Sequence, residues 1–122
     1  MHYVQMLIFT KPWFDKDECW QNMLQGRADA ATNPAPQPVH AMEAQSAAAM
    51  THDTRKDLPN VTCPALVIGG KDDAFTPRWM GEEVASLLPK ADLHLYDNAG
   101  HAFHWECLED FNPRTTEWLL SH

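Results

Sequence analysis

The spacing of apolar residues along the chain changes near residue 57. Before that point the pattern predicts helices, the first over roughly Val4 to Phe9 and resuming from about Asp17 to Leu24. Residues 39–51 (VHAMEAQSAAAMT) predict a second helix, because most of them are good helix formers. Between them, residues 32–38 (TNPAPQP) predict a loop, because proline lacks a backbone donor and restricts the residue before it.

After residue 57, short apolar runs alternate with helical patterns. The run ALVI (residues 65–68) stands between a proline and two glycines and predicts a parallel strand buried on both faces. A helix is expected over residues 76–88, with Thr76 as its N-cap and Pro77 as its first residue. The apolar stripe of this helix consists of Met80, Val84, Leu87 and Leu88.

A second strand and a last helix complete this half of the chain. Residues 92–96 (DLHLY) alternate between polar and apolar types and predict the strand. Residues 108–120 predict the helix, with Asn112 as its cap and Pro113 near its start. Its inner face is expected to consist of Phe111, Thr115, Trp118 and Leu119. Because strands alternate with helices, the predicted fold class is α/β, with a short parallel sheet flanked by helices.

The composition is that of a folded protein with an acidic charge balance. Hydrophobic residues make up 44% of the 122 residues and charged residues 21%, which excludes a disordered chain. The formal net charge of −8 disfavours nucleic acids and anionic membranes as partners, because their phosphates would be repelled. Cys19, Cys63 and Cys107 are widely spaced and predict reduced thiols. Without a signal-peptide pattern or a long apolar segment, a cytoplasmic location is expected.

Polar residues gather after the two predicted strands. Asp72 and Asp73 follow the first strand, and His101 follows the second. Ligands of open α/β sheets bind beyond the carboxyl ends of the strands, so an acid and a histidine placed there can meet. Asp73 and His101 are 101 − 73 = 28 residues apart, which leaves room for one helix and one strand between them.

The stretch from Asp53 to Leu120 carries these residues inside a longer motif. The motif consists of His52-Asp53, Leu58, Val61, Pro64, Leu66-Val67-Ile68, Gly70, Asp73, Pro77, Gly100-His101, Glu106, Phe111-Asn112 and Trp118-Leu119-Leu120. So many elements in this order resemble the C-terminal part of an α/β-hydrolase of the esterase, lactonase and carbon–carbon hydrolase type. The resemblance implies a partial α/β-hydrolase fold in which residues 1–56 form a helical lid-like segment and residues 57–122 form a core segment.

The resemblance also assigns roles to two residues. His101 would be the general base of a catalytic triad, and Asp73 the acid that orients its imidazole ring. Asp73 is preferred to Asp72 because the family places the acid three residues after the glycine and four before the proline (70 + 3 = 77 − 4 = 73). The implied function is hydrolysis of a carboxylic ester, a lactone or a related small substrate, and no cofactor or metal is implied.

The chain departs from the family pattern at the nucleophile. It contains no G-x-S-x-G elbow and no H-G turn for an oxyanion hole. Its three serines, Ser46, Ser86 and Ser121, lack flanking glycines, and relatives with Asp or Cys nucleophiles keep a similar acid and histidine. Two parallel strands alone form a poor sheet, so either a homo-oligomer or pairing with a chain that supplies the N-terminal half is expected.

Three other interpretations remain open from the sequence. The chain is alternatively a catalytically inactive truncated hydrolase that serves as an oligomerising or binding module. His101, His104 and Cys107 stand at regular spacings of three and suggest, more weakly, a zinc site. Aromatic and sulfur-containing residues either line an apolar substrate pocket or only pack; they are Trp13, Phe14, Trp20, Met23, Phe103 and Trp105.

Overall fold

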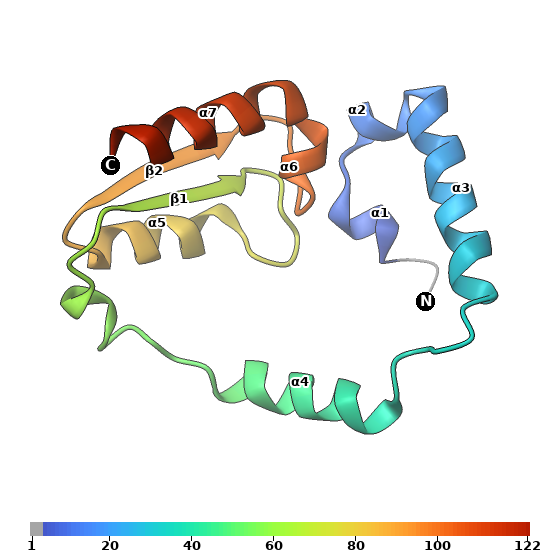
Figure 1. Cartoon of the computed structure of the whole chain (residues 1–122), viewed down its shortest axis with the longest axis horizontal. Coiled ribbons are helices and arrows are strands. Elements are labelled where there is room, and N and C mark those ends of the chain that lie inside the picture. Colours follow the sequence, from blue (N-terminus) through green and yellow to red (C-terminus); the bar gives the residue numbers. More distant parts are fainter. Residues whose placement is uncertain (1–3) are drawn as a thin grey trace.

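The computed structural model describes residues 4–122, and its N-terminal half is helical (Figure 1). The helices of this half are α1 (Gln5–Ile8), α2 (Lys11–Phe14), α3 (Asp17–Ala31) and α4 (Val39–Thr51). The two parts of the expected first helical piece appear as α1 and α3, and a further short helix, α2, with Pro12 in its first turn, lies between them. Helix α3 continues seven residues beyond the predicted end at Leu24, whereas α4 has the predicted bounds.

The second half contains two parallel strands joined through a helix. Strand β1 (Ala65–Gly70) pairs with strand β2 (Ala91–Tyr96), and Ala65 lies opposite Ala91 while Gly70 lies opposite Tyr96. A short 3-10 helix, η1 (Leu58–Asn60), precedes the sheet, and α5 (Arg78–Leu87) connects the strands. The short α6 (Phe103–Glu106) and the long α7 (Leu108–Ser121) follow. Within residues 4–122 the sheet has these two strands, as expected for a partial α/β-hydrolase fold.

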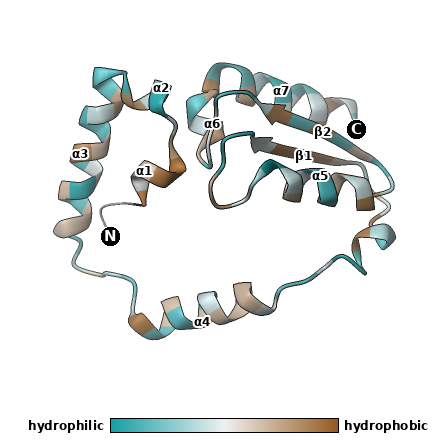
Figure 2. Ribbon diagram, turned by 180° about the vertical axis from the view of Figure 1, so that it is seen from behind, coloured by the Kyte–Doolittle hydropathy of each residue, from teal (hydrophilic) through white to brown (hydrophobic). Residues whose placement is uncertain are grey.

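Helices α5 and α7 cover opposite faces of the sheet (Figure 1). Side chains alternate between the two faces along a strand. Leu95 lies next to Gly81 of α5, whereas Tyr96 donates a hydrogen bond from its hydroxyl to Asp110 of α7 at 2.8 Å. Helices α3 and α7 mix hydrophilic and hydrophobic residues along their length, as helices with one covered side do (Figure 2).

The structure corrects three expectations about the sheet region. The ALVI run of β1 is half-buried along its length and not buried on both faces, because β2 is its one neighbour among the described strands. Pro77, not Thr76, occupies the N-cap of α5, because the Thr76 hydroxyl is bonded to Asp73. Pro113 lies inside α7 and Asn112 is not a cap, since the helix already begins at Leu108.

The inner face of α7 also differs in one position from the prediction. Phe111, Thr115 and Trp118 are half-buried, and the Trp118 indole donates a hydrogen bond to Asp92 at 2.7 Å. Leu119 is 70% exposed and therefore does not belong to this inner face. Among residues 4–122, no helix combines the length and the apolar character that crossing a bilayer requires.

His94 on β2 gives a prediction about pH. Its Nε2 atom is buried without a hydrogen-bond partner among the described residues, and burial, followed by the nearby Arg114 charge, lowers the pKa of His94 below 6.5. A lowered folded-state pKa contributes stability that is present above the unfolded value of 6.5 and lost as the pH falls through the folded value. His94→Leu is therefore expected to flatten the decline in melting temperature below pH 6.5, measured by thermal unfolding of both proteins. An unchanged pH profile in His94→Leu would contradict this assignment.

Candidate active site

The loops after the two strands meet at one edge of the sheet. Gly70 and Tyr96 end their strands opposite one another, so residues 71–77 and 97–102 start side by side. Lys71 donates its N–H to the Tyr96 carbonyl at 2.9 Å, and Asp72 donates its N–H to the Ala99 carbonyl at 3.0 Å. Backbone hydrogen bonds thus hold the two loops together, independently of the side chains of the site.

Asp73 is held by its own loop. Its Oδ1 atom accepts hydrogen bonds from the N–H groups of Phe75 (2.7 Å) and Thr76 (3.0 Å), and its Oδ2 atom accepts one from the Thr76 hydroxyl (2.6 Å). The Asp73 side chain is only 2% exposed. A carboxylate with so many donors and so little room has one orientation, and this orientation turns Oδ2 toward the second loop.

His101 completes the contact from the other loop. Its Nδ1 atom lies 2.9 Å from Asp73 Oδ2, and the ring of Phe75 stands edge-on to the imidazole with centroids 5.3 Å apart. Because an ionised carboxylate only accepts, Nδ1 carries the proton and Nε2 is left as an acceptor. The His101 side chain is 46% exposed. Of the two candidate acids, Asp73 faces the histidine, while Asp72 is exposed.

The hydrogen bonds around Asp73 keep it ionised. Burial by itself would raise its pKa, but the bonds from Thr76, His101 and Phe75 outweigh burial and hold the pKa below 3.8. Neither the Thr76 hydroxyl nor the Phe75 ring was assigned to the site from the sequence. The spacing of Thr76 three residues after Asp73 is the signal that could have revealed the first.

The lowered pKa of Asp73 predicts that the protein loses stability as the pH falls. The carboxylate contributes stability that is present above the unfolded value of 3.8 and lost as the pH falls through the folded-state value. Thr76→Val removes one donor and is expected to cost about 1 kcal/mol of unfolding free energy at pH 7. Urea unfolding of both proteins at pH 7 and at a series of pH values below 3.8 measures this, because the difference between them should shrink progressively as Asp73 becomes protonated. A difference that stays constant through the series would argue against this role of Asp73.

The serines of the chain lie away from His101. The Ser86 hydroxyl donates to the Glu83 carbonyl of its own helix at 2.7 Å, and the Ser121 hydroxyl donates to the Trp118 carbonyl at 2.9 Å. Both serines belong to the last turns of α5 and α7, at the opposite end of the strands from the histidine loop (Figure 1). Ser46 belongs to α4, which stands apart from the sheet in the same view. The tertiary structure thus pairs an acid with a histidine and brings no serine to them.

The cysteines and the proposed zinc ligands show no special arrangement. Burial, with the charges of Glu106 and Asp110, raises the pKa of Cys107, which favours the thiol and not the nucleophilic thiolate. Cys19, Cys63 and Cys107 are all free thiols. Over residues 4–122, no group of three His, Cys, Asp or Glu side chains is arranged to hold a metal ion, so His101, His104 and Cys107 do not form such a site.

The aromatic residues near the histidine loop form two groups, one around Phe9 and one around Phe103. Phe9 stacks on Trp13 with ring centroids 3.8 Å apart and lies 6.0 Å from Trp105. Phe103 stacks on Tyr96 at 6.1 Å and belongs to the packing beneath the loop. Trp105 is 62% exposed, so part of its surface is free to contact a ligand. Met23, one of the predicted pocket residues, is buried.

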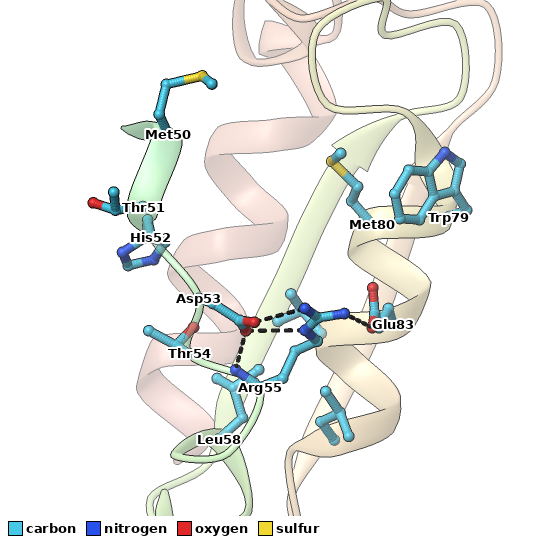
Figure 3. Close-up of a pocket in the computed structure, with 12 residues that line it drawn as sticks. Met50, Thr51, His52, Asp53, Thr54, Arg55, Leu58, Trp79, Met80 and Glu83 are labelled. Atoms are coloured by element: carbon cyan, nitrogen blue, oxygen red, sulfur yellow. Dashed lines mark hydrogen bonds and ion pairs between the residues drawn. The ribbon is translucent and has the colours of Figure 1, made fainter. Parts of the chain in front are cut away.

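A separate hollow of about 480 Å³ lies between the segment before the sheet and helix α5 (Figure 3). Arg55 makes two side-chain hydrogen bonds to Asp53, at 2.9 and 2.6 Å, and approaches Glu83 to 3.9 Å. These hydrogen bonds from Arg55 lower the pKa of Asp53 to about 2. Neither Asp73 nor His101 lines this hollow, so it is separate from the candidate active site.

Comparison with known sequences identifies the family of this chain. The model of the alpha/beta hydrolase family matches residues 3–114. A 2-hydroxy-6-oxo-6-phenylhexa-2,4-dienoate hydrolase of Burkholderia cepacia is 31% identical over 109 residues, covering 88% of this chain and 38% of the relative. A 2-hydroxy-6-oxononadienedioate/2-hydroxy-6-oxononatrienedioate hydrolase of Burkholderia vietnamiensis is 42% identical over 62 residues, covering 51% of this chain and 22% of the relative. The chain therefore spans less than half the length of these relatives.

Solved structures show the same fold. An alpha/beta hydrolase enzyme from the metagenome of lagoon sediments at Mar Chica, Morocco, has a TM-score of 0.64 and 31% identity, over 83% of this chain and 45% of that one. Rv0554 from Mycobacterium tuberculosis has a TM-score of 0.79 at 24% identity, over 98% of this chain and 42% of that one. The family match, the parallel strands and these structural neighbours lead to one conclusion: the chain belongs to the alpha/beta hydrolase family, of whose fold it forms a part.

Proposed function

We propose that this chain supplies the acid and the general base of a hydrolase that acts on a small carbonyl substrate. The observation that carries the proposal is the contact between His101 Nδ1 and Asp73 Oδ2 at 2.9 Å, made by an imidazole whose side chain is 46% exposed. A buried carboxylate that orients a half-exposed imidazole is the arrangement that general-base catalysis needs.

In this mechanism His101 Nε2 accepts the proton of a nucleophilic hydroxyl as that oxygen attacks the substrate carbonyl. Asp73 keeps the proton on Nδ1 and stabilises the imidazolium that forms. The imidazolium then returns its proton to the leaving group, and a water molecule, activated by the same ring, completes hydrolysis. The free Nε2 acceptor and the ionised Asp73 both support this sequence of steps.

The nucleophile would come from the N-terminal part of the fold, which lies outside these 122 residues and would carry a G-x-S-x-G elbow. This chain contains no such motif, and its serines are not near His101. A second copy of the same chain cannot contribute an elbow, so a homo-oligomer would cover the sheet without completing the triad. The N-terminal half of the fold would therefore pair with the open side of β1, either as a separate chain or as a segment that precedes these residues.

The substrate proposed is a carboxylic ester, a lactone or a 6-oxo dienoic acid of the kind that the relatives hydrolyse. The two relatives named above act on 2-hydroxy-6-oxo acids. Next to His101, Phe75 contributes an exposed ring, and Trp105 contributes another from helix α6. Such surfaces suit an apolar substituent beside the carbonyl group, with residues 1–56 as the lid-like segment over it.

A complementation experiment tests the proposal. The chain is co-produced with the part of the Burkholderia cepacia relative that it does not match, and each polypeptide is also assayed alone. We expect hydrolysis of p-nitrophenyl acetate and of 2-hydroxy-6-oxo-6-phenylhexa-2,4-dienoate by the pair only. In the pair, His101→Ala should lower kcat by at least about 10³-fold. An assembled pair that is inactive, or whose activity survives His101→Ala, would favour the binding-module interpretation.

A further inference from the structure

The carboxylate of Glu106 joins two segments that are far apart in sequence. Its Oε1 atom accepts the Thr10 N–H at 2.6 Å and the Thr10 hydroxyl at 2.7 Å, across 96 residues of chain. Its Oε2 atom accepts the Gly100 N–H at 2.5 Å. Thr10 lies between α1 and α2, and Gly100 precedes His101, so one side chain bridges the helical segment 1–56 and the histidine loop.

A second bond strengthens the same connection. The N–H of Ala102 donates to the Ile8 carbonyl at 2.8 Å. Both sequence neighbours of His101 are therefore restrained through their N–H groups. The N–H of Gly100 bonds to the Glu106 carboxylate, and the N–H of Ala102 bonds to the Ile8 carbonyl. Ala99 and Ala102 are 0% and 4% exposed, so the loop has little freedom to move.

The packing leaves little room for another arrangement. A side chain at Gly100 would place its Cβ atom 2.9 Å from the Ile8 carbonyl oxygen, so the two segments touch through backbone. On its other side the loop is held to the end of β1 through the bond from the Asp72 N–H to the Ala99 carbonyl at 3.0 Å. The position of the imidazole thus depends on the sheet at one side and on residues 8–10 at the other.

We propose that Glu106 is a positioning residue that couples the placement of the helical segment 1–56 to the orientation of His101. This inference rests on the proposed function for the role of His101. When the helical segment is in place, Glu106 and Ile8 hold both neighbours of His101, and Nδ1 faces Asp73. When the segment moves away, Thr10 leaves Glu106 and Ile8 leaves Ala102, and the histidine loop loses these two restraints.

A carboxylate suits this position because it only accepts hydrogen bonds. Three donors converge on it, the N–H and hydroxyl of Thr10 and the N–H of Gly100. Glutamine would present an amide N–H₂ to at least one of these donors, and alanine would leave all three without this partner. Glu106→Gln keeps the size of the side chain while it replaces one acceptor oxygen by a donor and removes the negative charge, which makes it the sharper variant.

Nuclear magnetic resonance of the purified chain tests the coupling without requiring turnover. In Glu106→Gln we expect the amide protons of Thr10 and Gly100 to exchange with solvent at least about tenfold faster, while exchange in β1 and β2 stays within about twofold. The ring-nitrogen chemical shifts of His101 should show a smaller share of the Nδ1-protonated form. Glu109→Gln, on the exposed side of the next helix, is the matched control and should change neither signal.

A second variant and an activity measurement complete the test. Thr10→Val removes the hydroxyl but keeps the N–H, and it should produce a smaller change of the same sign at Gly100 and His101. In the complemented enzyme, Glu106→Gln should lower kcat by about 10- to 100-fold with KM within about twofold, because the imidazole is misplaced. Unchanged exchange and unchanged His101 shifts in Glu106→Gln would overturn the coupling. An inactive wild-type pair with these changes present would instead count against the proposed function alone.

Discussion

Asp73→Asn is expected to lower kcat of the complemented enzyme by about 10⁴-fold while leaving the protein folded. The amide oxygen of asparagine can still accept the bonds from Phe75 and Thr76 that the carboxylate accepts at 2.7 and 3.0 Å. Its N–H₂ group then faces His101 and donates to Nδ1. The imidazole is forced to carry its proton on Nε2, so it can no longer accept one from a nucleophile.

The adjacent residue provides the control for this prediction. Asp72 is exposed and meets the histidine loop only through its backbone N–H, so Asp72→Asn should leave kcat within about twofold. Initial rates of p-nitrophenyl acetate hydrolysis by the two complemented variants give the comparison. Equal losses in both variants, or a larger loss in Asp72→Asn, would mean that the acid has been assigned to the wrong residue.

Gly70→Ala is expected to destabilise the protein by at least about 3 kcal/mol. A Cβ atom at this position would lie 2.2 Å from the Ala99 carbonyl oxygen and 2.3 Å from that of Gly100. Both obstacles are backbone atoms of the histidine loop and cannot rotate away as a side chain could. The loop would have to leave the end of β1, so the contact between His101 and Asp73 should be lost together with stability.

Two other glycines serve as controls in the same urea-unfolding measurement. At Gly69 an added Cβ would meet only the Leu95 side chain at 3.3 Å, so Gly69→Ala should cost less than about 1.5 kcal/mol. At Gly26, in the exposed part of α3, nothing lies within 4 Å, and alanine should stabilise the helix by about 1 kcal/mol. If the Gly70→Ala protein were as stable as the Gly69→Ala protein, the prediction would be wrong, because the histidine loop could then move aside at little cost.

Local sequence patterns were sufficient to predict the two strands in the second half of the chain. The ALVI run between a proline and two glycines predicted β1, and the alternation in DLHLY predicted β2, each within two residues of the observed ends. Both signals arise from residues adjacent in sequence, since strand alternation and glycine or proline punctuation are local properties. The positions of Asp73 and His101 after these strands followed from the same reading, together with the family motif.

Errors arose where another interaction competed with a helix-start preference. Thr76 has the chemistry of an N-cap, but its hydroxyl is bonded to Asp73, and Pro77 occupies the N-cap position of α5 without a side-chain hydrogen bond. The predicted start of α7 at Leu108 is confirmed, but Asn112 and Pro113 lie inside the helix and do not mark its beginning. An N-cap preference is worth only about 1 kcal/mol, so a hydrogen bond of similar strength, such as that of the Thr76 hydroxyl to Asp73, can change the outcome.

The sequence alone determined the α/β character, the two strands, the residues at their ends and the absence of a serine elbow within these 122 residues. Only the tertiary structure showed that Asp73, and not Asp72, faces His101, and that Glu106 joins Thr10 to Gly100. The physical reason is the range of the interactions. Strand and helix signals depend on neighbours a few residues away, whereas a hydrogen bond across 96 residues depends on how the whole chain packs.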